Sequence, residues 1–292
     1  MTINRKLLKK RLLNLRMFRR YLLRKLLRRG VTNKSTVIFI VTFPRSGSTA
    51  LGSLFDSIGA PFHYYGEIFG FNQWPKSIER ITLNYPFFSS RYLKQFLLKK
   101  KTGTIPYIFE TSGLKPEKVL RSIQKSPGIH VFKIMSFHFH PEKLEALIEE
   151  FHPKVFFLRR NHLDRFISTK KAQATGKWHG FNTDDDVIEI DEKSLAHSIG
   201  DSIDFYNSVR QCCCSNNVDW LDLDYSEVFS QSKLREIMDF AGVQISQNDL
   251  ISLITTKRQD SKHLSRETFL QNSHSSGTPK SLADYNFVKA DD

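Results

Sequence analysis

A short polar run in the first third of the chain has the residue types of an anion-binding loop. Arg45, Ser46, Gly47, Ser48 and Thr49 follow one another there and offer one guanidinium group, three hydroxyl groups and a glycine. Guanidinium and hydroxyl groups bind phosphate oxygens, and consecutive main-chain N–H groups add donors to the same site. The run therefore predicts a phosphate as the bound anion.

A second group of this kind lies about 110 residues further along the chain. Arg160 follows the apolar run Val155–Leu158, and Ser168 stands eight positions after Arg160 in a stretch with helical spacing. A guanidinium presents a planar pair of donors to phosphate oxygens, and a serine two helical turns later can add another donor. The pair is therefore physically suited to a phosphate as well.

Both groups follow runs that are typical of buried strands. The run Val37–Val41 is unbroken and mostly β-branched, as in a central strand of a parallel sheet that is buried on both faces. Pro44 and Gly47 break this strand, and a helix up to Gly59 is predicted by the apolar positions Ala50, Leu51, Leu54, Phe55 and Ile58. The loop thus leads into a helix N-terminus, where unpaired N–H groups carry a partial positive charge.

The rest of the chain alternates strands with helices. Further strands are predicted over 61–65, 129–135 and 218–225, the last of them beside the first strand. Helices are predicted over 114–124, 141–151, 192–216 and 247–256, and another one ends near 242. This alternation is typical of α/β proteins with a parallel sheet.

The first loop differs from the nucleotide-kinase loop, which carries a glycine five residues before its second glycine and a lysine before its hydroxyl residue. No glycine stands five residues before Gly47, and Ser48 follows Gly47 directly. The run Pro44–Thr49 instead resembles the 5′-phosphosulfate-binding loop of the sulfotransferases that use 3′-phosphoadenosine 5′-phosphosulfate (PAPS). Arg160 and Ser168 are similar in spacing to the pair that holds the 3′-phosphate of PAPS in those families.

A third likeness points to one branch of these enzymes. The segment Thr175-Gly176-Lys177-Trp178-His179 resembles the corresponding segment of the bacterial trehalose sulfotransferases. The chain is therefore similar to the trehalose-type and nodulation-type carbohydrate sulfotransferases. The resemblance implies an α/β fold of the P-loop-NTPase type, with three layers in which helices flank a central parallel sheet. It also implies PAPS as co-substrate, no metal, and a carbohydrate or glycolipid hydroxyl as sulfuryl acceptor.

The resemblance also assigns catalytic roles to Glu67 and Arg45. Glu67 follows the predicted strand 61–65, where the trehalose-type and nodulation-type enzymes carry their proposed base. Transfer to a hydroxyl needs a base within hydrogen-bond reach of the acceptor proton. Arg45 would stabilise the charge that develops on the bridging phosphate oxygen. The alternative for Glu67 is a loop carboxylate, exposed or paired with Arg45 or another basic residue.

A histidine base is the other alternative. Animal cytosolic sulfotransferases place a catalytic histidine two residues after a lysine at a strand end, but Met135 stands two residues after Lys133. His138 and His140 lie just beyond this point. Either one could accept the proton, and otherwise both are surface loop residues.

Two basic residues late in the chain fit a further role in PAPS binding. Many sulfotransferases close the PAPS pocket with a basic residue from a late loop, and Lys257 and Arg258 stand at such a place. A helix C-terminus also favours Lys and Arg by itself, so both explanations stay open.

The positive charge of the protein is concentrated at its N-terminus. Of the formal net charge of +14, residues 1–30 supply twelve through Lys and Arg with no acidic residue, which leaves +2 for residues 31–292. The spacing of the leucines predicts a basic amphipathic helix over 1–30. An anionic membrane surface is the expected contact of this helix. Packing on the body, a targeting role and nucleic acid binding are the alternatives.

We therefore expect a helical extension over 1–30, a sulfotransferase domain over 31–270 and a surface tail over 271–292. No apolar run approaches the length of a membrane span, and the three consecutive cysteines 212–214 are typical of reduced residues. A cytoplasmic location with peripheral membrane contact is predicted, and the resemblance adds a homodimer. The rival functions are another nucleotide-dependent transferase or kinase, and a non-enzymatic basic protein that binds membrane or RNA.

Overall fold

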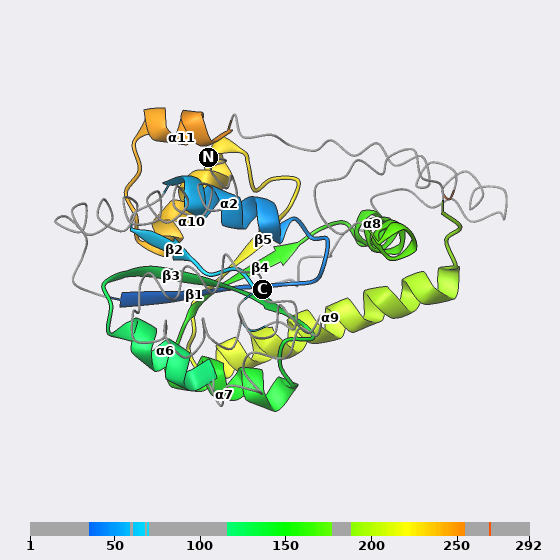
Figure 1. The fold of residues 1–292 in the computed structure, drawn as a ribbon, viewed down its shortest axis with the longest axis horizontal. Helices are drawn as coiled ribbons and strands as arrows, with labels where there is room; N and C mark the ends of the chain where they lie inside the picture. The colour runs from blue at the N-terminus through cyan, green and yellow to red at the C-terminus, as the bar shows by residue number, and fades with distance from the viewer. Residues whose placement is uncertain are drawn as a thin grey trace, which may run out of the picture.

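The computed structural model describes residues 35–58, 61–67, 69, 116–176, 188–254 and 269. Five strands form one sheet in which every neighbouring pair is parallel, with the order β2-β3-β1-β4-β5 (Figure 1). The strands are β1 (Ser35–Thr42), β2 (Phe62–Tyr64), β3 (Gly128–Met135), β4 (Lys154–Arg159) and β5 (Trp220–Asp224). The predicted parallel α/β sheet is confirmed.

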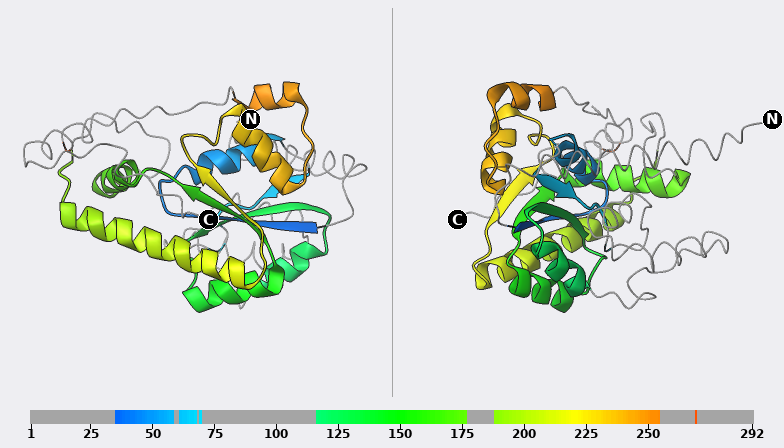
Figure 2. Two further views of the ribbon diagram at one scale, coloured as in Figure 1. Left: turned by 180° about the vertical axis from the view of Figure 1, so that it is seen from behind. Right: turned by 60° about the vertical axis from the view of Figure 1, so that its left-hand side comes forward.

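Helices cover both faces of this sheet. They are α2 (Ser48–Ile58), α6 (Pro116–Gln124), α7 (Pro141–Phe151), α8 (His162–Thr175), α9 (Glu192–Ser215), α10 (Gln231–Ala241) and α11 (Gln247–Ile254). Figures 1 and 2 show α2, α10 and α11 on one face of the sheet and α6, α7 and α9 on the other. The predicted three-layer arrangement is therefore confirmed.

Strand β1 is buried on both faces because its side chains alternate between two hydrophobic cores. Val37, Phe39 and Val41 pack in the core that contains α6, α7 and α9. Ile38 and Ile40 pack in the core that contains α2 and α10. Burial of one such side chain contributes roughly 1.5–3 kcal/mol, so the strand is held firmly in the middle of the sheet.

The position predicted for the strand over 218–225 is wrong. Strand β5 pairs with β4 and forms one edge of the sheet, while β3 and β4 occupy the two sides of β1. The alternation of apolar and acidic residues in β5 suits an edge strand with a partly exposed face, and Trp220 is 38% exposed. That alternation distinguishes an edge strand from a central one, but it does not identify the neighbour.

Helix α8 is capped at both ends. The side chain of Asn161 accepts hydrogen bonds from the main-chain N–H groups of Leu163 and Asp164. Gly176 follows the helix in the left-handed conformation, with φ of 68°, so the helix ends at Thr175. The predicted extension over 1–30, the tail over 271–292 and the segment after Gly176 that carries Trp178 lie outside the described residues.

Candidate active site

The carboxyl end of β1 lies where the chain connections diverge to the two sides of the sheet. From β1 the chain passes through α2 to β2 at one edge, whereas β4 and β5 extend the sheet on the opposite side. Thr42, the last residue of β1, is in register with Met135 of β3 and Leu158 of β4. Open α/β sheets bind ligands outside the carboxyl ends of their strands at such a point.

The loop between β1 and α2 has a strained and specific backbone. Arg45 has φ of 67° and Gly47 has φ of 85°. A Cβ atom on Gly47 would lie 2.1 Å from the ring of Tyr225, so only glycine fits beneath that ring. The main-chain N–H of Ala50 donates to the carbonyl of Gly47 at 2.9 Å, which begins α2 immediately after the loop. The predicted order of strand, tight loop and helix N-terminus is confirmed.

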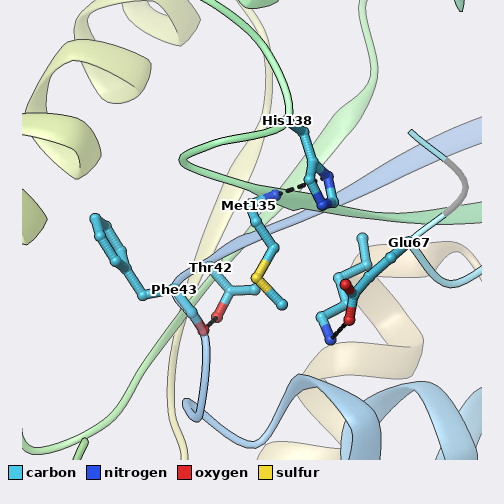
Figure 3. Close-up of polar contacts among 6 residues, drawn as sticks. Thr42, Phe43, Glu67, Met135 and His138 are labelled. Carbon is cyan, nitrogen blue, oxygen red and sulfur yellow. Dashed lines mark hydrogen bonds and ion pairs between the residues drawn. The ribbon is translucent and has the colours of Figure 1, made fainter. Parts of the chain in front are cut away.

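Aromatic packing and buried hydrogen bonds fix the start of this loop. Phe43 packs against Phe205 and Tyr206, with ring centroids 5.3 and 5.7 Å apart. The hydroxyls of Thr42 and Tyr206 both donate to the carbonyl oxygen of Leu158, at 3.0 and 2.7 Å. The ends of β1 and β4 are therefore tied together, and the loop leaves from a rigid base. Figure 3 shows the further hydrogen bond from the Thr42 hydroxyl to the carbonyl oxygen of Phe43, at 3.3 Å.

The two predicted phosphate-binding groups meet at this edge of the sheet. Nη1 of Arg160 donates to the main-chain oxygen of Arg45 at 3.2 Å, and Nε of Arg45 donates to Oγ of Ser168 at 2.8 Å. The guanidinium of Arg160 also lies 5.3 Å from the ring centroid of Tyr225. Burial lowers the pKa of Arg45, and the positive charge of Arg160 lowers it further. An anion bound between the two guanidinium groups would offset this repulsion.

The three hydroxyl residues of the loop differ in their exposure to solvent. Ser46 and Ser48 are buried, and Thr49 is exposed in the first turn of α2. Oγ of Ser46 has no hydrogen-bond partner among the described residues. A buried polar atom without a hydrogen-bond partner is energetically unfavourable. A bound oxyanion that accepts a hydrogen bond from the Ser46 hydroxyl would therefore stabilise the loop. The loop therefore fits the anion that the sequence predicts.

Glu67 is held beside the loop by a buried lysine. Nζ of Lys133 lies 2.5 Å from Oε1 of Glu67, and the two side chains are 4% and 28% exposed (Figure 3). The main-chain N–H of Lys133 donates to the carbonyl of Gly66 at 3.0 Å, which fixes the backbone next to Glu67. Burial lowers the pKa of Lys133, and the carboxylate of Glu67 counteracts this shift. Glu67 is thus paired with a basic residue other than Arg45, which is one form of the alternative to a catalytic base that the sequence left open.

His138 and His140, the two candidate histidine bases, differ in burial. His140 is exposed and caps α7, as expected for a surface residue. His138 is buried, so the surface position predicted for it is wrong. The reason is a tight turn after β3, in which the N–H of His138 donates to the carbonyl of Met135 and the N–H of Met135 donates back to Nδ1 of His138. Burial lowers the pKa of His138 to about 4.

The remaining sequence predictions concern two late basic residues, a metal site and a membrane span. Lys257 and Arg258 lie outside the described residues. Within residues 35–254 as far as the structure describes them, no cluster of three or more His, Cys, Asp or Glu residues could hold a metal ion. The described helices also include none with the length and apolar character of a membrane span.

The fold and the site define an α/β protein with a strand–loop–helix junction at the carboxyl edge of a parallel sheet, where Arg45 and Arg160 lie in place of a kinase-type lysine. A family model described as the sulfotransferase domain matches residues 35–282. The chain therefore belongs to the sulfotransferase domain family.

One solved structure with a detectable likeness is the mouse sulfotransferase SULT7A1 complexed with PAP. Its sequence identity is 14%, the TM-score is 0.43, and the match covers 75% of this chain and 61% of the mouse chain. The chain thus spans less than two thirds of that relative. No curated protein sequence matches the chain.

Proposed function

We propose that this protein transfers the sulfuryl group of PAPS to a hydroxyl group of a carbohydrate or glycolipid. The observation that carries the proposal is the junction of Arg45 and Arg160, whose guanidinium groups come from two strand ends and share one site with Ser168. A bisphosphorylated nucleotide offers one anionic group to each arginine. Membership of the sulfotransferase family supports the same chemistry.

The loop and the second strand end have separate tasks in this proposal. The 5′-phosphosulfate would be bound at the N-terminus of α2 by Arg45, the hydroxyls of Ser46, Ser48 and Thr49, and the main-chain N–H groups of residues 47–49. Arg160 and Ser168 would bind the 3′-phosphate. Oγ of Ser168 accepts from Arg45, so its own hydrogen is available to donate to a phosphate oxygen.

Glu67 acts as the general base in the proposed reaction. The acceptor oxygen forms a bond to sulfur while its proton passes to the carboxylate of Glu67. The bond from sulfur to the bridging phosphate oxygen breaks, and the nucleotide keeps the electron pair. Arg45 and the loop N–H groups stabilise the negative charge that develops on the bridging oxygen. Lys133 holds Glu67 in place and supplies a positive charge beside the transferring group.

The choice of acceptor rests on the sequence segment Thr175–His179, which resembles that of the trehalose-type enzymes. The basic residues in 1–30 suit an anionic membrane surface, where a glycolipid acceptor would be presented. A homodimer, a cytoplasmic location and a pocket-closing role for Lys257 or Arg258 stay predictions.

Calorimetry with two nucleotides tests the donor. We expect the protein to bind adenosine 3′,5′-bisphosphate (PAP) without added metal and to bind ATP with Mg²⁺ much more weakly. A preference for ATP with Mg²⁺ would instead indicate phosphoryl transfer.

Labelled PAPS tests the acceptor. The panel contains trehalose, N-acetylglucosamine oligomers and vesicles with glucosylceramide, and the product that acquires the label identifies the acceptor class. Sulfation of a phenol or a protein in place of these acceptors would contradict the carbohydrate assignment.

A further inference from the structure

His138 has a buried ring nitrogen that no part of the proposed reaction uses. The side chain is at the carboxyl end of β3 and the residue is only 8% exposed. Its Nε2 has no hydrogen-bond partner among the described residues. Polar atoms buried to this degree are almost always paired, so an unpaired one at the edge of a binding site points to a ligand atom as its partner.

The other ring nitrogen determines where the ring carries its proton. Nδ1 accepts a hydrogen bond from the main-chain N–H of Met135 at 3.2 Å. An accepting nitrogen carries no hydrogen, so the neutral ring has its hydrogen on Nε2. His138 is therefore a hydrogen-bond donor at Nε2 and not a proton acceptor there. In this tautomer Nε2 cannot accept the proton of an acceptor hydroxyl.

The charges around the ring place it on the side of Glu67. Burial is the main reason why the pKa of His138 falls to about 4. The carboxylate of Glu67 opposes this shift, and the ammonium of Lys133 adds to it. A contact with the Lys133 main chain raises the pKa slightly. Arg45 acts in turn on the pKa of Lys133. The charges of Arg45, Lys133 and Glu67 and the ring of His138 therefore belong to one region of the site. Figure 3 shows the ring extending from its turn toward the part of the site that holds Met135 and Glu67.

We propose that Nε2–H of His138 donates a hydrogen bond to the oxygen of the acceptor hydroxyl and orients that hydroxyl for Glu67. The inference rests on the proposed sulfuryl transfer and adds a residue that touches the acceptor. A hydroxyl oxygen has two lone pairs, and its hydrogen points to the carboxylate of Glu67. One lone pair then faces the sulfur atom and the other accepts from His138. A neutral donor holds the oxygen without withdrawing as much electron density as a cation would.

The turn that carries His138 fixes the position of its ring relative to β3. Two hydrogen bonds join His138 to Met135, the main-chain one at 2.9 Å and the side-chain one at 3.2 Å. The ring is thus fixed to the end of β3, the strand that also carries Lys133. His138 is thus fixed to β3, and Glu67 is fixed to the same strand through its ion pair with Lys133, which favours a single orientation of the acceptor oxygen between them.

Nitrogen NMR of the ¹⁵N-histidine-labelled full chain tests the protonation state. We expect the His138 ring to be neutral from pH 5.5 to 8 with its hydrogen on Nε2. A hydrogen on Nδ1, which would then face the Lys133 carbonyl, would overturn the proposal, and so would a pKa in the neutral range.

Two matched substitutions test the contact with the acceptor. His138→Gln keeps an N–H donor near the position of Nε2, whereas His138→Asn places its amide near Nδ1 only. Transfer of labelled sulfate from PAPS is measured to trehalose, and to water if trehalose is not accepted. We expect His138→Gln to stay within about threefold of the wild-type rate and His138→Asn to lose about tenfold or more, mainly in the KM for trehalose or in the rate of hydrolysis.

The outcomes separate this inference from the proposed function. Unchanged PAP binding in both variants, with the loss confined to His138→Asn, supports the inference. Inactivity of His138→Gln to the level of Glu67→Gln would make His138 a base, and full activity of His138→Asn would remove its contact with the acceptor. Failure of the wild-type protein to bind PAP would contradict the proposed function itself, whatever His138 does.

Discussion

Nη1 of Arg160 lies 3.2 Å from the main-chain oxygen of Arg45 and donates a hydrogen bond to it. This bond joins the end of β4 to the loop after β1, which are far apart in the sequence. Arg45 meanwhile uses its Nε for Ser168 on α8. The two arginines therefore lie in one site, where a ligand with two phosphate groups can contact both.

Gly47→Ala tests whether the loop depends on its close contact with Tyr225. The new Cβ would lie 2.1 Å from the Tyr225 ring, in a backbone conformation with φ of 85°. We expect a loss of about 1–3 kcal/mol in the free energy of unfolding, measured in urea, together with weaker PAP binding.

Gly200→Ala in the middle of α9 is the matched control for Gly47→Ala. A Cβ at Gly200 meets nothing within 4 Å, so this substitution is expected to stabilise the protein by up to about 1 kcal/mol. Equal stability of Gly47→Ala and the wild type would show that the loop does not need a glycine.

Glu67→Gln tests the general base. The amide keeps the shape of the side chain but cannot accept the acceptor proton at neutral pH. We expect kcat to fall by about 100- to 10,000-fold while the Kd for PAP changes by less than about threefold. Glu150→Gln, which alters an exposed carboxylate paired with Arg121, is the control and should leave both constants unchanged. A Glu67→Gln variant with nearly full activity would exclude Glu67 as the base.

We expect the buried side chain of His162 to lower the free energy of unfolding in mild acid. Burial and, to a lesser extent, the charges of Arg165 and Arg159 together lower its pKa to about 4. Between pH 6.5 and 4 the unfolded chain therefore binds a proton at this position that the folded chain does not bind. The free energy of unfolding should fall as the pH drops through this range, by on the order of 3 kcal/mol from His162, and should be flat above pH 7.

Urea unfolding between pH 4.5 and 7.5 measures this dependence. His162→Gln should reduce the slope below pH 6.5, although it also removes the contact between Nδ1 and Ser202. His197→Gln is the control because the side chain of His197 is 81% exposed. A slope in His162→Gln as steep as in the wild type would contradict the assignment.

Replacement of the basic residues in 1–30 by glutamine tests the membrane contact. We expect the wild type to bind vesicles with phosphatidylserine and to dissociate as salt is raised, because the attraction is electrostatic. The replaced chain should lose this binding and keep its affinity for PAP, since no residue assigned to the nucleotide site lies in 1–30. Salt-independent binding, or binding to neutral vesicles only, would point to a different partner.

The strand ends that carry Arg45 and Arg160 could be predicted from the sequence for a physical reason. An apolar run buried on both faces is typical of a parallel sheet, and the carboxyl ends of parallel strands lie at one edge. Ser168 then follows from helical spacing after Arg160. In the structure Arg160 contacts the main chain of Arg45, and Arg45 contacts Ser168, while the role of Arg160 and Ser168 at a 3′-phosphate stays a prediction.

Contacts that depend on which strands are neighbours were not predictable in the same way. The pairing of Glu67 with Lys133 follows from the place of β2 next to β3, and no local pattern encodes that order. Likewise, β5 lies beside β4, and Tyr225 at its end therefore covers Gly47. The burial of His138 depends on a tight turn after β3 that folds its ring back onto the N–H of Met135, and no local pattern in the sequence encodes that turn.

The affinities of Arg160→Ala for PAP and for AMP, measured by calorimetry, test the central claim most directly. Arg121→Ala is the control, because the side chain of Arg121 is 61% exposed and pairs with Glu150, which is not a residue of the site. Removal of a charge-assisted hydrogen bond costs about 1.5–3 kcal/mol, so PAP binding by Arg160→Ala should weaken by about 10- to 150-fold while AMP binding changes by less than about threefold. Equal losses for PAP and AMP would contradict an account in which Arg160 binds the 3′-phosphate and Arg45 the 5′ end of one nucleotide.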